Sequence, residues 1–434
     1  MVEAWQSLAT TTQDILLLVA LLIPALAVGV ALHWGYRVSP LLIGLLRRHA
    51  WLCGTFVALI ALSVAMGAGI TAQERGLREG SARAAEKFDI VVAAPGSPYS
   101  AMLATVFLET QVLPLLGGEV YDAVANHPNV ALAAPIAFGD SYQGAPVVGT
   151  TGEFVTHLAG GLTQGRMFET ISEAVLGADI PLDLGDSFEP VHGDGSQGVL
   201  DEHGFAYTAV GRMPPTGSPW DKAILVAVES VWDVHSLPTG HGPDWDGALG
   251  PPFIADEFPG TPAILVRASE FWANYALRAE FTTEDTMAFF PGTVLSELYT
   301  VMGDVRRVMS VLSVVTLTLV AVSVLIGLAM LMRLLAPRLA LLHAMGAPRR
   351  FALAVTWSLA ALLIATGALL GLILALFAVQ WISAQISAQT DITVKAHLSW
   401  AEIHLAAGFV SLASLLALIP AALAASRGFG QIRA

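Results

Sequence analysis

Charged residues are scarce in this chain of 434 residues, and basic residues are scarcer than acidic ones. Charged side chains make up 13% of the sequence, against roughly 25% in an ordinary soluble protein. Hydrophobic side chains make up 55%, and 21 Lys and Arg stand against 35 Asp and Glu, for a net charge of −14. A nucleic-acid backbone is bound by clustered Lys and Arg. The composition therefore argues against a purely soluble protein and excludes nucleic acid as a partner.

Cysteine and lysine are almost absent. The one cysteine, Cys53, cannot form an intramolecular disulfide, and its apolar surroundings favour the role of a small core residue. None of the three lysines, at positions 87, 222 and 395, follows Gly in the G-x-x-x-x-G-K-(S/T) loop that binds nucleotide phosphates. No paired carboxylates, Ser-His-Asp order or Cys-His pattern points to catalysis. We therefore expect that this chain is not an enzyme, has no catalytic residues, binds no organic cofactor and does not hydrolyse ATP itself.

Five long runs contain no Asp, Glu, Lys or Arg, and each is long enough for a helix to cross a hydrocarbon core of about 30 Å. They are residues 15–32, 50–73, 308–332, 351–390 and 403–426. The first run is read as a retained helix kinked at Pro24, not a cleaved signal peptide, because the residues before it include Glu3 and Asp14 but no Lys or Arg. The chain is therefore expected to cross the lipid bilayer five times.

The arginine residues predict the orientation of these helices. Nine Arg and no acidic residue lie in the connections 33–49 and 333–350 and in the tail after residue 426. Segment 74–307 contains 31 acidic and 11 basic residues. Basic connections stay on the cytoplasmic side of a membrane. We therefore expect a multi-pass membrane protein with its N-terminus and its large acidic segment outside and its C-terminus in the cytoplasm.

This pattern predicts an α-helical membrane region interrupted by one large extracytoplasmic domain. Strand-like and helix-like segments alternate irregularly in that domain, which favours an α+β fold. The expected strands are 88–94, 130–138, 145–150, 205–211, 223–228 and 262–268, and 99–126 is expected to be a helix. The predicted parts are an extra N-terminal transmembrane helix (1–35), a cytoplasmic amphipathic segment with the first core transmembrane helix (36–73), the extracytoplasmic domain with its stalks (74–303), and three transmembrane helices with a cytoplasmic loop at 333–350 (304–434).

The two connections between the membrane and the outer domain are predicted to be helical stalks. Residues 71–87 change from apolar to charged, helix-favouring sequence with no proline, and residues 294–336 also contain no proline. About 15 further helical residues add roughly 20 Å of length. Such stalks either transmit motion or act as simple spacers, and the sequence leaves both open.

Several segments carry a resemblance to a known family. They are, in chain order, LLIGLLRRHAWLCGTFVALIAL from residue 41, FDIVVAAPGSP from residue 88, LTQGRMFETISEAVLGADIPLDLGDSFEP from residue 162, FAYTAVGRM from residue 205, and RLALLHAMGAPRRFALAVTWSLAALLIATGALLGL from residue 338. In this order and spacing they resemble the FtsX-like permease family, in particular the membrane subunits of ABC transporters of the MacB and LolC/LolE type. The helix at 1–35 is additional to the four membrane helices usual in that family.

The resemblance implies a fold, a location and partners. It implies a four-helix FtsX-like core and a MacB-like periplasmic domain in the bacterial inner (plasma) membrane. It also implies a homodimer or heterodimer of permeases that works with a separate cytoplasmic ABC ATPase, which uses the ATP. The absence of a phosphate-binding loop from this sequence agrees with a motor that lies on another chain.

The loop at 333–350 is the candidate contact with that ATPase. Apolar residues recur at helical spacing within it, and Gly346 and Pro348 are helix-stop signals. A short amphipathic helix of this kind inserts its apolar face into a groove of a partner and moves the membrane helices attached to it. A turn whose arginines only set the topology is the alternative. The candidate coupling residues are Arg338, Leu339, Leu341, Leu342, Met345 and Gly346.

Histidines and acidic residues gather in the stretch 181–260, where Gly, Pro and Asp predict loops. The candidate metal ligands are His192, His203, His235 and His241. Imidazole and carboxylate groups are ligands that zinc accepts, so this stretch predicts a zinc site. Its spacing lacks the tight pattern of a structural zinc site, and histidines exposed to solvent in an acidic loop are the alternative.

Two hypotheses of function follow. In the first, the chain is the permease subunit of an ABC transporter that couples the ATPase to movement of the outer domain (mechanotransmission) for export or extraction of a lipid, a peptide or a metal-related cargo. In the second, it is a membrane-anchored regulator that relays ATPase motion to an extracytoplasmic enzyme or sensor, and nothing is transported. The outer domain engages either the cargo or an extracytoplasmic partner protein.

Overall fold

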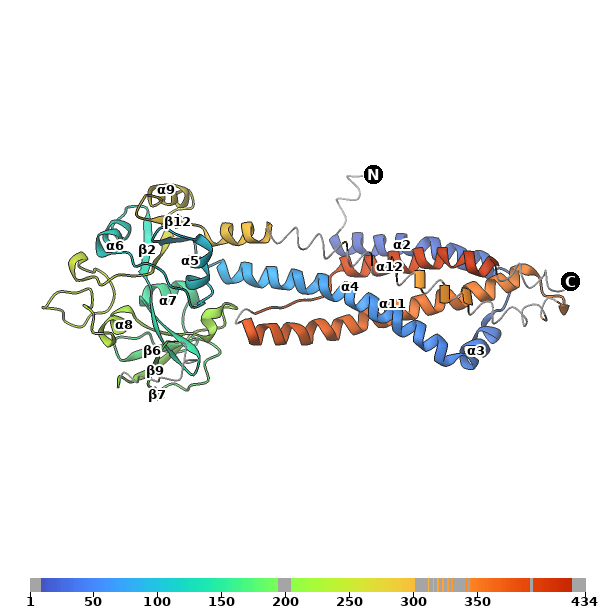
Figure 1. Cartoon of the computed structure of the whole chain (residues 1–434), viewed down its shortest axis with the longest axis horizontal. Coiled ribbons are helices and arrows are strands. Elements are labelled where there is room, and N and C mark those ends of the chain that lie inside the picture. The colour runs from blue at the N-terminus through green and yellow to red at the C-terminus, as the bar shows by residue number, and fades with distance from the viewer. Residues whose placement is uncertain are drawn as a thin grey trace. The chain divides into compact units, whose positions relative to one another are not determined.

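The computed structural model describes residues 9–193, 204–300, 345–390 and 393–423, together with single positions between 311 and 344. The chain folds into two compact units (Figure 1). Unit 1 comprises Met1–Gly76, Asp304–Ser383 and Lys395–Ala434, and unit 2 comprises Leu77–Gly303 and Ala384–Val394. Each unit has its own core and is described by itself.

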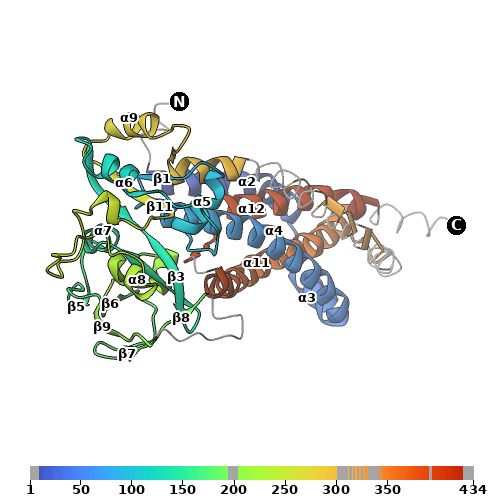
Figure 2. The same ribbon diagram turned by 60° about the vertical axis from the view of Figure 1, so that its left-hand side comes forward.

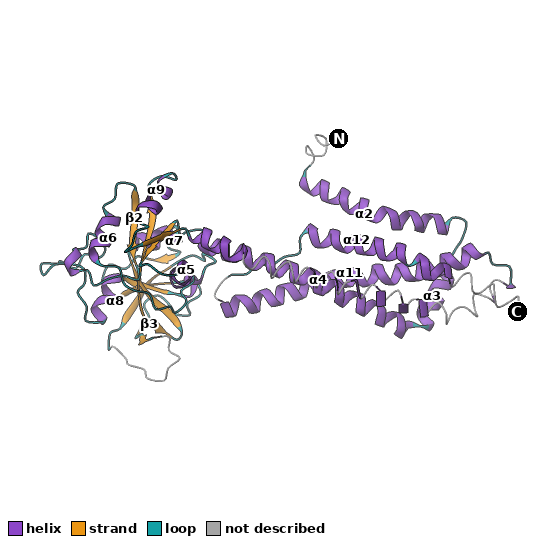
Figure 3. Ribbon diagram, turned by 45° about the horizontal axis from the view of Figure 1, so that its top comes forward, coloured by secondary structure: helices purple, strands orange, loops and turns teal. Residues whose placement is uncertain are grey.

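Unit 1 is built of helices, whereas the strands that the structure describes all lie in unit 2 (Figure 3). Four helices among the described residues are long and apolar enough to cross a membrane, which confirms four of the five predicted spans as helices of that kind. They are α2 (Thr10–His33), α4 (Ala50–Ala85), α11 (Arg349–Thr390) and α12 (Trp400–Leu416), the last continued by helical residues to Leu423. The fifth span, at 308–332, lies mostly outside the described residues, and the positions described within it are helical.

A short helix, α3 (Ser39–Arg48), precedes α4. Its residues Leu42 and Leu45 pack against the buried core of unit 1, while Arg47 and Arg48 occupy its last turn. An apolar face combined with basic residues is typical of a helix that lies at a membrane surface. The amphipathic segment expected before the first core membrane helix is therefore present as a separate helix.

Glycines bring α4 and α11 into close contact. A Cβ atom on Gly367 would lie 2.7 Å from the Cβ of Ile60, and one on Gly371 would lie 2.7 Å from the carbonyl oxygen of Ala61. Small residues spaced four apart allow close helix packing within membranes, because no side chain holds the two backbones apart. The two helices are therefore packed almost backbone to backbone at this level.

The extra N-terminal helix α2 lies beside α12 (Figure 1), and none of its residues is buried. Nη2 of Arg350 donates a hydrogen bond to the carbonyl oxygen of Ala31 at 2.6 Å. Nε2 of His404 lies 2.9 Å from the carbonyl oxygen of Asp14. Among the described residues, a buried cluster of unit 1 comes instead from α4, α11 and α12 with the residues that follow it, and α2 is peripheral to this cluster.

Helix α4 is one uninterrupted helix of 36 residues that supplies residues to both units. It continues past its apolar part to Ala85, which confirms the predicted helical extension of this span. Helix α11, of 42 residues, likewise passes from unit 1 into unit 2 at Ala384. In the second predicted stalk, residues 291–300 are helical, and most of the remainder lies outside the described residues.

The described residues of unit 2 form two sheets flanked by short helices, which confirms the predicted α+β class. The smaller sheet is antiparallel and has the order β12 (Met287–Phe289), β1 (Ile90–Ala93), β11 (Ala263–Ala268), β2 (Val130–Pro135). The larger sheet has the order β5 (Gln164–Gly165), β9 (Tyr207–Arg212), β6 (Glu173–Leu176), β10 (Ile224–Ala227), β4 (Ala145–Thr150), β3 (Ala137–Tyr142), β8 (Val191–His192), and β7 (Ser187–Phe188) pairs with β9. The chain passes from one sheet to the other at Ile136.

A tight hairpin sets the register at one side of the larger sheet. Its two turn residues, Gln143 and Gly144, join β3 to β4 and have φ angles of 49° and 85°. Positive φ at both positions gives the turn the twist of the flanking strands, and glycine adopts that conformation without strain. The resulting register places Asp140 opposite Val147 in β4 and opposite His192 in β8.

The prediction of a single helix over residues 99–126 is wrong. Irregular residues 106–117 separate α5 from α6: Leu108 has a φ angle of 54°, outside the right-handed helical region, and Pro114 has no N–H with which to continue a helix. Leu116 instead forms an isolated bridge with Thr261. Besides residues 291–300 and the ends of α4 and α11, the helices described in unit 2 are α5 (Pro98–Thr105), α6 (Gly118–Ala125), α7 (Gly152–Ala159), α8 (Val228–Val234) and α9 (Ala273–Glu280), with short 3-10 turns at Pro219–Lys222 and Ala255–Glu257.

Aromatic rings fill much of the core of unit 2. Phe88, Phe154 and Trp220 form one group, with ring centroids 5.4–6.0 Å apart. A second group packs around Tyr121 and Phe253. Every strand predicted from the sequence overlaps an observed strand, because the Val, Ala and Ile residues that suggested the strands are the ones buried between these groups.

Candidate functional site

Three side chains with metal-binding groups converge at one side of the larger sheet of unit 2. Asp140 lies in β3, His192 lies in the neighbouring strand β8, and His235 is the residue that ends α8. Figure 2 shows these three elements within unit 2, and α8 and β8 both contact β3. One ligand atom from each residue lies within 4.8 Å of the others. Strand pairing thus brings together residues that are far apart in the sequence.

The three ligand atoms form a small triangle. Nδ1 of His192 lies 3.3 Å from Oδ1 of Asp140 and 3.3 Å from Nε2 of His235. Nε2 of His235 lies 3.6 Å from Oδ1 of Asp140. The side chain of Asp140 is 1% exposed, whereas that of His192 is about half exposed. The triangle therefore has a buried acidic corner and a corner open to solvent.

Contacts with the backbone orient the ring of His235. Its Nδ1 lies 2.7 Å from the carbonyl oxygen of Val231, one turn earlier in α8. Because a carbonyl oxygen only accepts, Nδ1 carries the proton, and Nε2 of the neutral ring presents its lone pair to the cluster. Gly139 leaves room for the ring, since a Cβ atom there would lie 3.1 Å from both Cε1 and Nε2 of His235. The fold thus directs one nitrogen of His235 toward Asp140 and His192.

Two of the four predicted metal ligands, His192 and His235, are brought together by the structure. His241 pairs instead with Glu229, whose Oε1 lies 3.3 Å from its Nε2, and it stacks on Trp245. His203 lies outside the described residues. The structure therefore supports the histidine cluster in a smaller form and does not bring His241 into it.

Sequence spacing does not reveal Asp140 as a member of the cluster. It belongs to the strand sequence AFGDSY, far from either histidine. Because Asp140 lies between the predicted strands 130–138 and 145–150, no local pattern marks it as a buried acid inside a strand. Its position opposite His192 follows only once β3 and β8 are paired.

A buried tyrosine lies near this cluster. The hydroxyl of Tyr207 lies 2.7 Å from Oγ of Ser230. Burial raises the pKa of Tyr207 to about 12; the hydrogen bond with Ser230 acts in the opposite direction, and the charges of Asp140 and Asp233 add to the increase. Tyr207 is therefore protonated at neutral pH and acts as a structural group rather than as a base.

The second candidate site is the predicted coupling loop of unit 1. Leu341 and Ala344 are helical, and the N–H of Met345 donates to the carbonyl oxygen of Leu341 at 3.1 Å. Gly346 has a φ angle of 98°, which ends the helix where the sequence predicted a stop. Leu341 and Met345 are 64% and 69% exposed. Two large apolar side chains one turn apart are therefore left on the surface.

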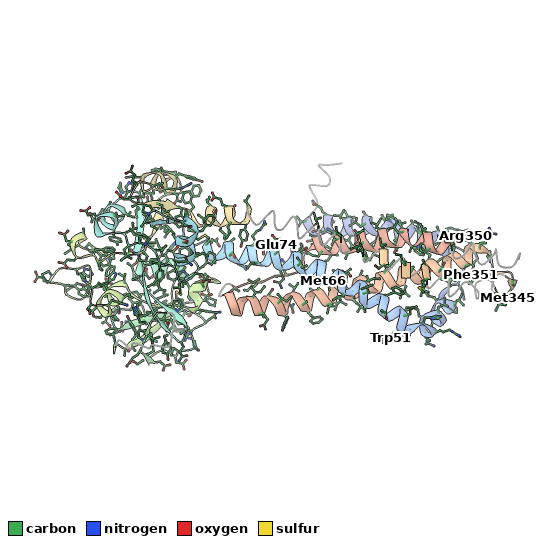
Figure 4. All side chains as sticks on the ribbon, in the orientation of Figure 1. Trp51, Met66, Glu74, Met345, Arg350 and Phe351 are labelled. Atoms are coloured by element: carbon green, nitrogen blue, oxygen red, sulfur yellow. The ribbon has the colours of Figure 1, made fainter. Side chains whose placement is uncertain are left out.

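The remaining predicted coupling residues, Arg338, Leu339 and Leu342, lie outside the described residues. Figure 4 shows Met345 at the same end of unit 1 as Arg350, with Trp51 toward that end. Trp51, at the start of α4, is almost fully exposed, as is usual for tryptophan at a membrane interface. We call this the basic end of unit 1, after Arg47, Arg48, Arg349 and Arg350.

Polar side chains bond to one another at the other end of these helices. Arg75 of α4 forms an ion pair with Glu402 of α12, whose side chain is 2% exposed. Oε2 of Glu402 also accepts hydrogen bonds from the N–H and Oγ of Ser399, each at 2.8 Å, and so caps α12. Gln73 donates to the carbonyl oxygen of Val379 in α11 at 2.7 Å. We call this group the Arg75 end of unit 1, and its polar groups hold three helices together.

No family model matches the sequence, and no curated protein matches it. Among solved structures, the periplasmic region of MacB from Actinobacillus actinomycetemcomitans is similar, with a TM-score of 0.31 and 10% sequence identity. The match covers 49% of this chain and 95% of that chain.

Proposed function

We propose that this chain is the membrane subunit of an ABC transporter and that a separate cytoplasmic ATPase hydrolyses the ATP. The subunit converts movement of the ATPase into movement of unit 2, which engages a cargo such as a lipid, a peptide or a metal-related substrate for export or extraction. The subunit pairs with a second permease, identical or related, in the bacterial inner membrane. The chain itself contributes docking and motion rather than catalysis.

The exposed apolar pair at the basic end is the observation that carries this proposal. Leu341 and Met345 lie one helical turn apart on the surface, and Gly346 ends the helix immediately after them. An apolar helix end of this kind fits a groove on a partner protein. Its attachment to α11, which begins at Arg349, gives the partner a short connection to a long helix.

Two long helices, α4 and α11, extend from unit 1 into unit 2. Helix α4 and helix α11 each contribute residues to both units without interruption. Within unit 1 they are held together at Gly367 and Gly371, and at the Arg75 end by Gln73. A displacement applied to the start of α11 is therefore shared with α4, and both helices carry it into unit 2 as rigid elements.

The charge distribution supports the orientation that this function needs. Arg47, Arg48, Arg349 and Arg350 belong to the connections that the positive-inside rule assigns to the cytoplasm, and Arg350 lies with Met345 at one end of unit 1 (Figure 4). A reporter that is active only in the cytoplasm should therefore work when fused after Ala434. It should fail when inserted beside Gly247, in unit 2. Activity at Gly247 would reverse the proposed orientation.

Replacing Leu341 and Met345 by aspartate tests the docking proposal. Both side chains are largely exposed, so the free subunit should insert and unfold like the wild type. Burying a carboxylate in an apolar groove without a partner costs several kcal/mol. We therefore expect the double variant to lose most of the ATPase that co-purifies with the wild-type subunit, and each single variant to lose less.

The matched control is Val112→Asp, which makes the same kind of change at a side chain that is 99% exposed in unit 2. This variant should retain the ATPase and its turnover in reconstituted membranes. Wild-type association and turnover in the Leu341→Asp/Met345→Asp variant would show that the motor docks elsewhere. The helix α3 would then be the next segment to test.

A further inference from the structure

We propose that Asp140, His192 and His235 form a binding site for a divalent transition-metal ion, with Zn²⁺ as the best-suited ion. The ligand atoms are Oδ1 of Asp140, Nδ1 of His192 and Nε2 of His235. The site belongs to unit 2 alone and does not depend on the proposed docking of an ATPase to unit 1.

The separations of the ligand atoms match the geometry of zinc. Zinc binds imidazole nitrogen and carboxylate oxygen at about 2.0–2.1 Å in a tetrahedral arrangement, so two of its ligand atoms lie about 3.3–3.4 Å apart. The three observed separations are 3.3, 3.3 and 3.6 Å. The three atoms therefore already occupy the corners of one face of a zinc tetrahedron.

The three separations within the triangle are long for hydrogen bonds. N–H···O hydrogen bonds are most often about 2.9–3.0 Å long, and all three separations exceed that length. In its neutral form, His235 uses its proton on Val231, so its Nε2 has none to donate to Asp140 or His192. A histidine that donates one ring nitrogen to a backbone carbonyl and presents the other to the site is the usual arrangement around a bound metal.

The kind of ligand selects the class of ion. Two imidazoles and one carboxylate form a set found in three-ligand zinc sites, whereas Mg²⁺ and Ca²⁺ prefer oxygen ligands throughout. The buried carboxylate of Asp140 supplies negative charge next to the cation. A tetrahedral ion takes its fourth ligand from outside these three residues.

Metal binding at this place connects three separate elements of unit 2. Asp140 belongs to β3, His192 to the two-residue strand β8 at the end of the larger sheet, and His235 to the end of α8. An ion that binds the folded state and not the unfolded state stabilises the fold. We therefore expect Zn²⁺ to raise the temperature at which unit 2 unfolds within the full-length protein.

The experiment uses the full-length protein in detergent after treatment with a chelator. Zn²⁺ is titrated in competition with a chromophoric chelator, and Co²⁺ is titrated as a spectroscopic probe. We expect about one equivalent of either ion to bind, with the strong visible absorption of tetrahedral Co²⁺. His192→Gln changes a half-exposed side chain, so its loss of binding cannot be attributed to unfolding. Asp140→Asn and His235→Ala should also abolish the Co²⁺ spectrum.

His241→Ala is the matched control, because it removes a histidine of unit 2 that pairs with Glu229 and lies outside the cluster. This variant should bind both ions like the wild type. Gly139→Ala keeps all three ligands but places a Cβ atom 3.1 Å from the ring of His235. Displacing that ligand should weaken binding by about 10- to 100-fold, the range seen when the support of a metal ligand is removed.

Three results would overturn the site. The first is wild-type protein that binds neither Zn²⁺ nor Co²⁺ under these conditions. The second is a His192→Gln variant with the wild-type Co²⁺ spectrum. The third is a loss in His241→Ala as large as that in His235→Ala, which would show that the ions also bind to histidines of unit 2 outside this triangle.

Discussion

The two ends of unit 1 use their side chains in opposite ways. At the Arg75 end, polar groups from α4, α11 and α12 bond to one another, and the side chain of Glu402 is almost completely buried. At the basic end, arginines lie on the surface helix α3 and at the start of α11, and the apolar side chains of Leu341 and Met345 are exposed. The Arg75 end pairs its polar groups with one another, whereas the basic end leaves two large apolar side chains exposed.

This difference indicates where unit 1 is rigid and where it is accessible to another protein. A buried ion pair is costly to break, because the charge left behind has no water around it. The Arg75 end therefore keeps three helices in a fixed register. Exposed apolar groups at the basic end gain free energy when a partner covers them. The proposed docking site and the proposed rigid connection thus lie at different ends of the same helices.

Removing Arg75 should give the largest loss of stability, because it removes the ion-pair partner of the buried Glu402. Arg75→Met leaves the buried carboxylate of Glu402 without its ion-pair partner, and we expect the free energy of unfolding in detergent to fall by about 3 kcal/mol. The matched change at the basic end, Arg48→Met, should alter it by less than about 0.5 kcal/mol. In the double variant Arg75→Met/Glu402→Gln, most of the lost stability should return. If Arg75→Met and Arg48→Met lower the free energy of unfolding equally, the two ends of unit 1 do not differ in how they stabilise it.

The glycine contact between α4 and α11 gives the next largest effect. In Gly371→Ala the new methyl group lies 2.7 Å from the carbonyl oxygen of Ala61, and overpacking of this kind costs about 2 kcal/mol. Gly408→Ala in α12 is the control, since a Cβ atom there meets nothing within 4 Å. Thermal unfolding of both variants measures the difference. Unchanged stability in Gly371→Ala would show that the two helices separate easily and cannot carry motion as one body.

The helix end at Gly346 offers a milder test of the basic end. Its φ angle of 98° is strained for a β-branched residue, so Gly346→Val should cost about 1 kcal/mol locally and shift the apolar pair. We expect a partial loss of coupled ATP turnover in reconstituted membranes, smaller than that of the Leu341→Asp/Met345→Asp variant. Gly346→Asn, which tolerates positive φ better, should retain more turnover. If the Gly346→Val and Gly346→Asn variants turn over ATP as fast as the wild type, the turn at Gly346 has no role in coupling.

An exposed ion pair in unit 2, between Arg166 and Glu173, is a comparison for the more buried ion pair between Arg75 and Glu402. The hydrogen bond from Arg166 lowers the pKa of Glu173 to about 2, and the side chain of Arg166 is about half exposed. Because this pKa lies below its unfolded value of about 4.3, the pair stabilises the fold above that pH and loses its contribution as the pH falls toward 2.

Glu173→Gln should therefore lower the unfolding temperature slightly at neutral pH, by less than any variant above, since exposed pairs contribute little. The difference from the wild type should shrink below pH 4 and vanish near pH 2. Unfolding curves across this pH range provide the measurement. A loss at neutral pH as large as that of Arg75→Met would mean that burial does not explain the strength of the Arg75 end.

The membrane helices and strands could be predicted because their signals are local. Long apolar runs identified α2, α4, α11 and α12, and short runs of Val, Ala and Ile identified strands such as β1 and β11. The helix expected at 99–126 is divided, since α5 ends at Thr105, Leu108 has a φ angle of 54°, and Pro114 precedes the start of α6. The passage of α11 into unit 2 has a weaker signal, because residues 380–390 change from apolar to Ser- and Gln-rich sequence without a charged residue.

Residue order alone determined the apolar spans, the separation of charge between their connections, the helix stop at Gly346 and the strand content of unit 2, because each depends on neighbours in the chain. Only the tertiary structure decided which distant groups meet. Asp140 became a partner of His192 and His235 through the pairing of β3 with β8 and the packing of α8, while His241 was directed to Glu229. Side chains from separate elements meet only after strands and helices pack, and sequence spacing contains no measure of that distance.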